Sequence, residues 1–279
     1  MSARLKEIAR QTEAIVAAGR YETPDGRTVL LGPDIAAARA GTRLHGPDPL
    51  PVTPDTDRHT AIEVTGEGST EAARRLTSAT AAADTDAPVA VLNFASARNP
   101  GGGYLNGARA QEEALCRVSA LYTTLLCAPA YYEHHRADRD PFYTDRVIHS
   151  PSVPVFRDDS GALLEHPYRV GFLTSPAPNT GVILRRTPEA AARVPGAVAV
   201  RAERVLETAV RGGYRRLVLG AWGCGVFQND PRVVAGAFHD LLTGTGRFAG
   251  HFDEVVFAIL DRTRTGATMA AFRDRFGGA

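Results

Sequence analysis

The chain has 279 residues, of which 44% are hydrophobic and 23% are charged, and its formal net charge is +1. This mixture is typical of a globular protein with a sizeable core, and the small net charge argues against binding to nucleic acid through bulk charge. Lys6 is the only lysine and lies in a polar terminal segment, which excludes Schiff-base chemistry, a pyridoxal phosphate lysine and a Walker phosphate loop.

Cysteine use and the first residues indicate an intracellular protein. The three cysteines form no C-x-x-C pair, which argues against a zinc ribbon, and scattered cysteines suit a reducing compartment. Charges run through Met1–Gly19, so this segment lacks the apolar core of a signal peptide, and no stretch has the apolar length of a membrane span. We therefore expect a cytoplasmic protein. We also expect it to be a monomer.

The first 58 residues are predicted to form an extension that packs on the main domain. The predicted elements are a helix over 3–18, a hairpin over 21–31 around Pro24-Asp25-Gly26, a helix over 34–40 and a proline-rich loop over 45–54. This segment is too short to hold its own core. We therefore divide the chain into an extension at 1–58 and a catalytic domain at 59–279.

After the extension, predicted strands and helices alternate. The strands cover 61–65, 88–95, 146–149, 168–174, 216–221 and 254–260, and the helices cover 70–83, 111–126, 188–211, 231–243 and 265–276. The segment 88–95 is almost wholly apolar, as expected for a strand buried on both faces. This alternation predicts a layered α/β domain with a largely parallel sheet.

Two glycine-rich loops follow two of the predicted buried strands. The first contains Gly101–Gly103 and leads into Gln111-Glu112-Glu113, and the second runs from Gly220 to Asp230. Ligands bind beyond the carboxyl ends of parallel strands, and glycine loops that lead to helix starts present N–H groups to phosphate. One such loop would more often mark a tight turn, but two suit a diphosphate. Rossmann, P-loop and G-x-S-x-G spacings are absent.

The triple glycine, seven further residues and Gln-Glu-Glu resemble the motif of the poly(ADP-ribose) glycohydrolases. Val91–Ser96, Thr174–Asn179 and Gly223–Phe227 resemble the bacterial-type branch, and the resemblance covers about residue 60 to the end. It implies a macrodomain-like three-layer sandwich with a mixed, largely parallel sheet and an N-terminal helical extension. It also implies hydrolysis of ribose–ribose bonds that releases ADP-ribose, which we expect to proceed from chain ends.

The resemblance also implies roles for individual residues. Glu113 resembles the catalytic glutamate, and Glu112 resembles the neighbour that holds the hydroxyls of the terminal ribose. Ser96 stands where animal members carry an asparagine that contacts this ribose. Phe227 resembles the aromatic residue that packs on the ribose and orients it.

Most of the remaining substrate-binding candidates follow from the same resemblance, and Asn179 follows from its expected place at a strand end. The two diphosphate loops comprise Gly101, Gly102, Gly103, Gly223, Cys224, Gly225, Val226 and Phe227. Gln111 belongs to the motif and is counted with them. Asn179 is expected either near the ligand or as a loop cap, and Glu67 is expected to contact adenine, as an acidic residue does in macrodomains.

The adjacent glutamates suit two different roles, because successive helical side chains project about 100° apart. A helix N-terminus lowers both pKa values, whereas mutual repulsion, burial and a nearby diphosphate raise one of them. We expect Glu112 to stay ionised and Glu113 to protonate the leaving ribose oxygen and then to activate water. This chemistry needs no metal and no cofactor. The triple glycine argues against the alternative of two solvated glutamates.

Several alternatives stay open. The same pocket would suit a hydrolase of mono-ADP-ribose on protein or nucleic acid, or a non-catalytic ADP-ribose reader, although a reader needs no acid. The expected partners are poly(ADP-ribose) or an ADP-ribosylated macromolecule, with no membrane and no sequence-specific nucleic acid. We interpret His134-His135 as part of a polar surface loop and not as a metal site. We interpret Cys224 as a small packing residue. Tyr104 and Trp222 are either core or ligand-stacking residues.

Overall fold

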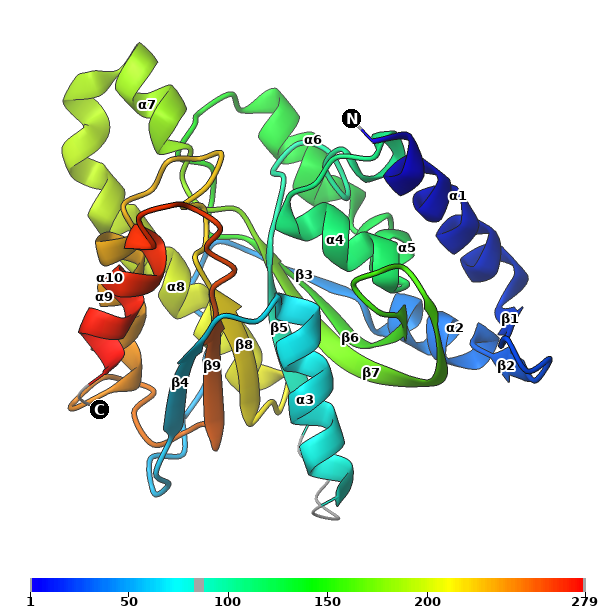
Figure 1. Ribbon diagram of the computed structural model, residues 1–279. Helices are drawn as coiled ribbons and strands as arrows, with labels where there is room; N and C mark the ends of the chain where they lie inside the picture. The colour runs from blue at the N-terminus through cyan, green and yellow to red at the C-terminus, as the bar shows by residue number, and fades with distance from the viewer. Residues whose placement is uncertain (1, 83–87, 278–279) are drawn as a thin grey trace.

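The computed structural model describes residues 2–82 and 88–277 and is built around one seven-stranded sheet (Figure 1). The strand order is β3-β6-β7-β5-β8-β9-β4. The parallel strands are β7 (Leu163–Ser175), β5 (Val89–Phe94), β8 (Arg216–Gly220), β9 (Glu254–Ala258) and β4 (Ala61–Thr65). The antiparallel strands β6 (Val147–Arg157) and β3 (Arg43–His45) complete one edge. The sheet is therefore mixed and largely parallel, as predicted.

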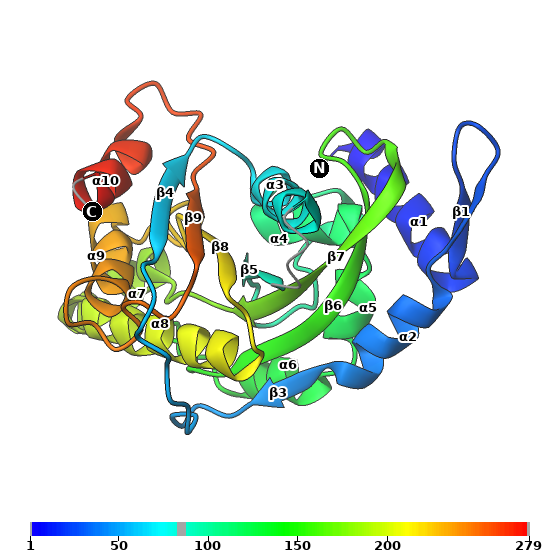
Figure 2. The same cartoon turned by 90° about the horizontal axis from the view of Figure 1, so that it is seen from below.

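Helices cover both faces of this sheet (Figure 2). The first face carries α1 (Ala3–Ala18), α2 (Gly32–Gly41), α3 (Ser69–Ala82), α4 (Gln111–Val118), α5 (Leu121–Leu125) and α6 (Pro129–Ala137). The second carries α7 (Thr180–Arg186), α8 (Val194–Arg211), α9 (Pro231–Leu242) and α10 (Ala267–Phe276). Successive strand side chains point to opposite faces, so Val91 packs in the first core and Leu92 in the second.

Two of the predicted helices are each interrupted. The predicted helix 111–126 divides into α4 and α5, because Ser119 is extended and bridges to Val155 of β6. The predicted helix 188–211 begins as a 3-10 helix, η2 (Pro188–Arg193), and continues as α8. Pro195, near the start of α8, cannot donate the N–H that one continuous helix would require.

The region between α5 and β7 differs most from the sequence expectation. We expected a polar surface loop around His134-His135, but these residues lie in α6, which buries Tyr131, Tyr132 and His135. The His135 Nδ1 atom lies 2.9 Å from the Tyr131 carbonyl oxygen. β6 is also longer than predicted, because a register shift between Ser150 and Val153 lets the strand continue past its prolines.

The first 58 residues are joined to the rest of the chain through several elements. Helix α1 contacts α4, and strand β3 adds to the main sheet beside β6. A separate hairpin pairs β1 (Arg20–Glu22) with β2 (Thr28–Leu30), as the sequence predicts.

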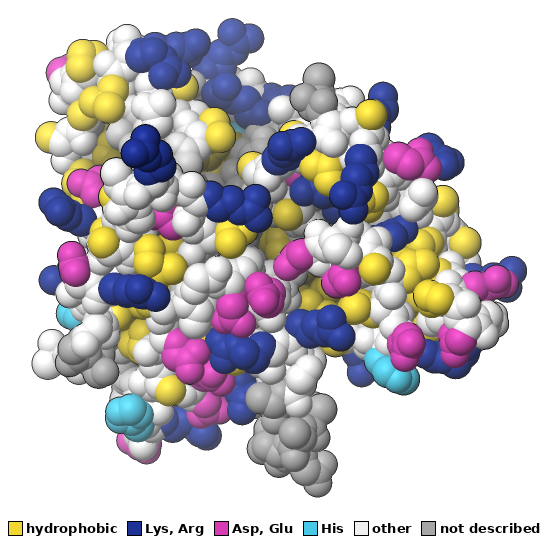
Figure 3. Space-filling model, viewed as in Figure 1, with side chains coloured by type: hydrophobic (Ala, Val, Ile, Leu, Met, Phe, Trp, Pro, Cys, Tyr) yellow, Lys and Arg dark blue, Asp and Glu magenta, His cyan; other side chains and the backbone are white. Residues whose placement is uncertain are grey.

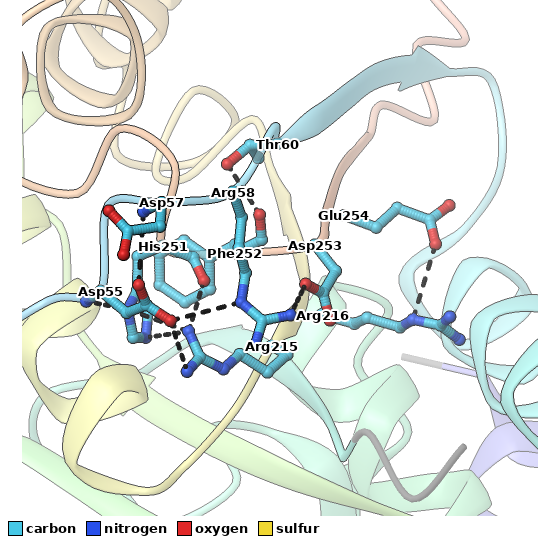
Figure 4. Close-up of polar contacts among 10 residues, drawn as sticks. All are labelled: Asp55, Asp57, Arg58, Thr60, Arg215, Arg216, His251, Phe252, Asp253 and Glu254. Carbon is cyan, nitrogen blue, oxygen red and sulfur yellow. Dashed lines mark hydrogen bonds and ion pairs between the residues drawn. The ribbon is translucent and has the colours of Figure 1, made fainter.

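A polar cluster fixes the segment that leads from the extension into β4 (Figure 4). The backbone N–H of Asp55 donates to Nδ1 of His251 at 2.8 Å, and Arg215 pairs with Asp55 at 3.3 Å. Arg58 pairs with Asp253 at 3.0 Å. Burial lowers the pKa of His251, which keeps the ring neutral and able to accept the Asp55 N–H.

Candidate active site

The two glycine-rich loops begin side by side, because they follow the adjacent parallel strands β5 and β8. The first spans residues 95–110 and the second spans 221–230. Both lie at the upper end of the sheet in Figure 1. The space-filling view shows a hollow at this end with basic side chains around it (Figure 3). This is where the sequence predicts the ligand.

Glu112 is buried beneath the first loop, with 3% of its surface exposed. Its Oε1 accepts a hydrogen bond from Nδ2 of Asn93 at 3.3 Å, and its Oε2 accepts one from the backbone N–H of Ser96 at 2.7 Å. Burial, with a smaller contribution from the charge of Glu113, raises the pKa of Glu112 to about 8 against the opposite effect of these donors. We expected Glu112 to stay ionised while it holds the ribose hydroxyls, and in the ligand-free protein the shift of its pKa runs in the opposite direction.

Glu113 lies beside Glu112 and is also buried, with 7% of its surface exposed. Its Oε1 accepts a hydrogen bond from the backbone N–H of Gly103 at 2.8 Å. Its Oε2 is buried and has no hydrogen-bond partner among the residues that the structure describes. Because buried carboxylate oxygens are normally satisfied, this atom is the one available to a ligand or a proton.

The triple glycine is required by close neighbours, which for Gly102 are the two glutamates. Gly102 has a left-handed backbone (φ 56°), and a Cβ atom there would lie 2.5 Å from Oε1 of Glu113 and 3.2 Å from Oε2 of Glu112. A Cβ at Gly101 (φ 64°) would lie 2.9 Å from the ring of Tyr122. A side chain at Gly102 would push the loop away from the carboxylates, and one at Gly101 would push it away from Tyr122.

The first loop and α4 are held from several sides. Gln111 accepts a hydrogen bond from the Phe94 N–H at 2.9 Å and donates one to the Leu92 carbonyl at 2.8 Å, so its amide ties α4 to the end of β5. The buried Tyr104 hydroxyl donates to Glu13 of α1 at 2.9 Å. Tyr104 is therefore a core residue, and the hydrogen bonds of Gln111 fix α4 against β5.

The second loop is tied to the start of α7. A Cβ at Gly223 (φ 71°) would lie 2.5 Å from Nδ2 of Asn229, which itself donates to the Pro178 carbonyl at 2.8 Å. The Phe227 carbonyl accepts the Gly181 N–H at 3.0 Å. Val226 is 81% exposed. The loop is thus anchored at its base and open at its tip.

Two further residues of this loop belong to the packing of the domain. Trp222 is fully buried, and its Nε1 donates to the Ser175 carbonyl at 3.0 Å. Burial raises the pKa of the Cys224 thiol to about 12, which disfavours a thiolate nucleophile at neutral pH.

The remaining candidates lie around the same end of the sheet. Asn179 accepts the Val182 N–H at 3.1 Å and so caps α7, which is the capping alternative. The Ser96 hydroxyl accepts the Asn99 N–H at 3.2 Å. Glu67 pairs with Arg75 at 2.9 Å, and this partner lowers the pKa of Glu67.

A groove of about 460 Å³ lies beside Glu67, at the ends of β4 and β9. Its lining residues come from the two strand ends and α10: Gly66, Ile259, Leu260, Asp261, Gly266, Met269, Ala270, Arg273 and Asp274. Within the described ranges, no three His, Cys, Asp or Glu side chains are placed to hold a metal ion. None of the helices described is long and apolar enough to cross a membrane.

Two residues near the site were not identified from the sequence. Asn93 donates a hydrogen bond to Glu112, and the sequence could have marked it, because it is a polar residue inside an otherwise apolar strand. Tyr143 lies with its ring centroid 6.0 Å from that of Phe227. No local pattern marks Tyr143, because this contact arises only when the segment after α6 folds against the second loop.

Comparison with known proteins places the chain in one family. Residues 9–158 match the family described as microbial-type PARG, catalytic domain. The poly(ADP-ribose) glycohydrolase from Thermomonospora curvata, bound to the inhibitor ADP-HPD, is 50% identical with a TM-score of 0.90, and the match covers 99% of this chain and 100% of that one. The enzyme from Deinococcus radiodurans in complex with ADP-ribose is 44% identical with a TM-score of 0.80, over 88% and 98% of the two chains. Curated proteins gave no significant match. The chain therefore belongs to the microbial-type poly(ADP-ribose) glycohydrolases.

Proposed function

We propose that this protein is a glycosidase that hydrolyses the ribose–ribose bonds of poly(ADP-ribose) and releases ADP-ribose, with Glu113 as the proton donor. The observation that carries the proposal is the buried pair of carboxylates beneath the triple glycine. Within this pair, only Glu113 offers a buried oxygen without a partner among the described residues. The family and the relatives solved with ADP-ribose or an inhibitor support the substrate.

The other site residues would bind different parts of the substrate. Glu112 would accept the hydroxyls of the terminal ribose, and Ser96, whose backbone already holds Glu112, lies beside the same ribose. The backbone N–H groups of the two glycine loops would bind the diphosphate. Phe227 would pack on the terminal ribose and orient it. The groove beside Glu67 would take the adenine.

The carboxylate pair supplies the proton. Burial above all, and to a smaller extent the charge of Glu113, favour a proton on Glu112 in the free protein. When ribose hydroxyls donate to Glu112, they favour its ionised form, so the proton belongs to Glu113 in the complex. Glu113 then protonates the leaving 2′ oxygen as the bond to C1″ breaks. A water molecule attacks C1″ and returns its proton to the Glu113 carboxylate.

The test is digestion of poly(ADP-ribose) by the purified protein, with free ADP-ribose as the product measured. Glu113→Gln should lower the rate by ~10² to 10⁴-fold and keep ADP-ribose affinity. Glu112→Gln should weaken both, and Glu133→Gln, at an exposed position on α6, should change neither. Hydrolysis by folded Glu113→Gln at the wild-type rate would exclude Glu113 as the acid. Activity only on mono-ADP-ribosylated protein would support the alternative substrate.

We further propose that the enzyme cleaves from chain ends, acts in the cytoplasm and is a monomer. The preference for ends is supported by α10 and the segment before it, which border the groove beside Glu67 where an interior chain would have to continue. The unpaired cysteines are compatible with a reducing compartment. Single ADP-ribose units should appear first in a digestion, and early release of long oligomers would contradict the preference.

A further inference from the structure

A partly exposed pair of side chains, Arg98 and Tyr143, borders the site next to Phe227. The Arg98 guanidinium carbon lies 5.8 Å from the centre of the Tyr143 ring, within the range of a cation–π contact. The Tyr143 ring in turn lies 6.0 Å from Phe227. We refer to Arg98 and Tyr143 together as the arginine–tyrosine wall.

Hydrogen bonds to neighbouring segments hold the arginine–tyrosine wall in place. The Arg98 Nε donates to the His135 carbonyl at 3.1 Å, and Nη1 of Arg136 donates to the Arg98 carbonyl at 2.9 Å. The Asn179 N–H donates to the Pro141 carbonyl at 2.8 Å, which fixes the segment carrying Tyr143. Tyr143 itself has a left-handed backbone (φ 58°), which is costly for a bulky residue and is found mostly where structure or function requires it.

The wall is also cationic and lacks an acidic partner. No carboxylate of a residue in 2–82 or 88–277 pairs with Arg98. The nearby acids have other partners, since Asp140 accepts the Phe142 N–H at 2.8 Å and Asp145 pairs with Arg201 at 2.9 Å. A partly exposed guanidinium on an aromatic ring is a surface on which unstacked bases bind.

The chemistry of the polymer indicates which base the arginine–tyrosine wall would bind. The bond that breaks joins C1″ of the terminal ribose to the 2′ oxygen of the next adenosine, whose adenine is attached to the neighbouring ribose carbon. The adenine of the leaving unit is therefore the aromatic group of that unit nearest to the bond. If Phe227 covers the terminal ribose, the Tyr143 ring, 6.0 Å from the Phe227 ring, is an aromatic surface adjacent to it.

Building on the proposed function, we propose that Arg98 and Tyr143 bind the adenosine of the leaving ADP-ribose unit. On this proposal the pair binds the leaving unit and not the terminal unit. Its contribution therefore depends on the leaving group, and a substrate with a small leaving group should not use it.

The test compares two substrates. One is poly(ADP-ribose), and the other is a trifluoroethyl α-ADP-riboside, whose leaving group is too small to reach the wall. Tyr143→Ala and Arg98→Ala should each lower kcat/KM on the polymer by about 5- to 100-fold, the range for loss of a base-stacking residue. Tyr143→Phe keeps the ring and should lose far less. Arg169→Ala, at an exposed arginine on β7, is the control.

Loss on the polymer with little change on the small substrate and in ADP-ribose affinity is the expected result. Equal loss on both substrates would overturn the proposal and assign the wall to support of Phe227. Unchanged polymer turnover would overturn it as well. Tyr143→Asn provides a second variant, because asparagine tolerates the left-handed backbone. If the wild type cleaved neither substrate, the proposed function itself would fail.

Discussion

Replacing Glu112 by glutamine should make the protein more stable at alkaline pH. The pKa of Glu112 rises from its ordinary 4.5 to about 8 in the fold. Below pH 4.5 the carboxyl is protonated in both the folded and the unfolded chain, and its contribution to stability is fully present. Above pH 4.5 the unfolded chain ionises first, so stability falls until the folded carboxyl also ionises near pH 8. At about 1.4 kcal/mol per pH unit, this amounts to about 5 kcal/mol.

A glutamine side chain cannot ionise, so the Glu112→Gln variant lacks this slope. Its free energy of unfolding minus that of the wild type should be larger by about 4 kcal/mol at pH 8.5 than at pH 5, so the variant is the more stable protein at the higher pH. Urea unfolding can be followed through Trp222, the only tryptophan, which is fully buried. Glu133→Gln, at an exposed glutamate, should follow the wild-type curve. If the wild type and Glu112→Gln lose stability in parallel, the pKa of Glu112 is not raised by burial.

Three further outcomes are expected. Gly102→Ala should abolish most activity, because its Cβ would lie 2.5 Å from Oε1 of Glu113. The control is Gly213→Ala, which should leave activity near wild type, because Gly213 is also left-handed but a Cβ there would have nothing within 4 Å. Equal rates for the two variants would contradict the packing argument. Phe227→Ala should slow hydrolysis on the order of 100-fold through lost alignment and weaken ADP-ribose binding less, as rate and calorimetry together would reveal. ADP-ribose should bind in the presence of a chelator, and calorimetric binding that required magnesium or zinc would contradict this.

Much of the fold followed from local patterns. The apolar run that became β5 and the amphipathic segment that became α1 were both predicted within one or two residues. The exceptions depend on distant contacts. The break at Ser119 arises from its bridge to Val155, and α6 is stabilised by aromatic side chains that enter a core formed by other elements.

The site divides in the same way. The triple glycine and the two glutamates lie close together in the sequence, so their association was predictable. The raised pKa of Glu112 was not, because it follows from burial under a loop whose position is set by the whole domain. The contact between Tyr104 and Glu13 joins residues 91 positions apart, and no local pattern predicts it.

Strand β4 determines when this domain can be completed during synthesis. It lies at the edge of the sheet, and among the described strands it pairs only with β9, where Ala61 faces Glu254. A ribosome therefore releases β4 long before its partner exists, and pairings of such large separation in the chain slow folding. A chain that ends before β9 would expose β4 as an unpaired strand open to association with other chains. The sheet can therefore be completed only after the nascent chain has grown long enough to include β9.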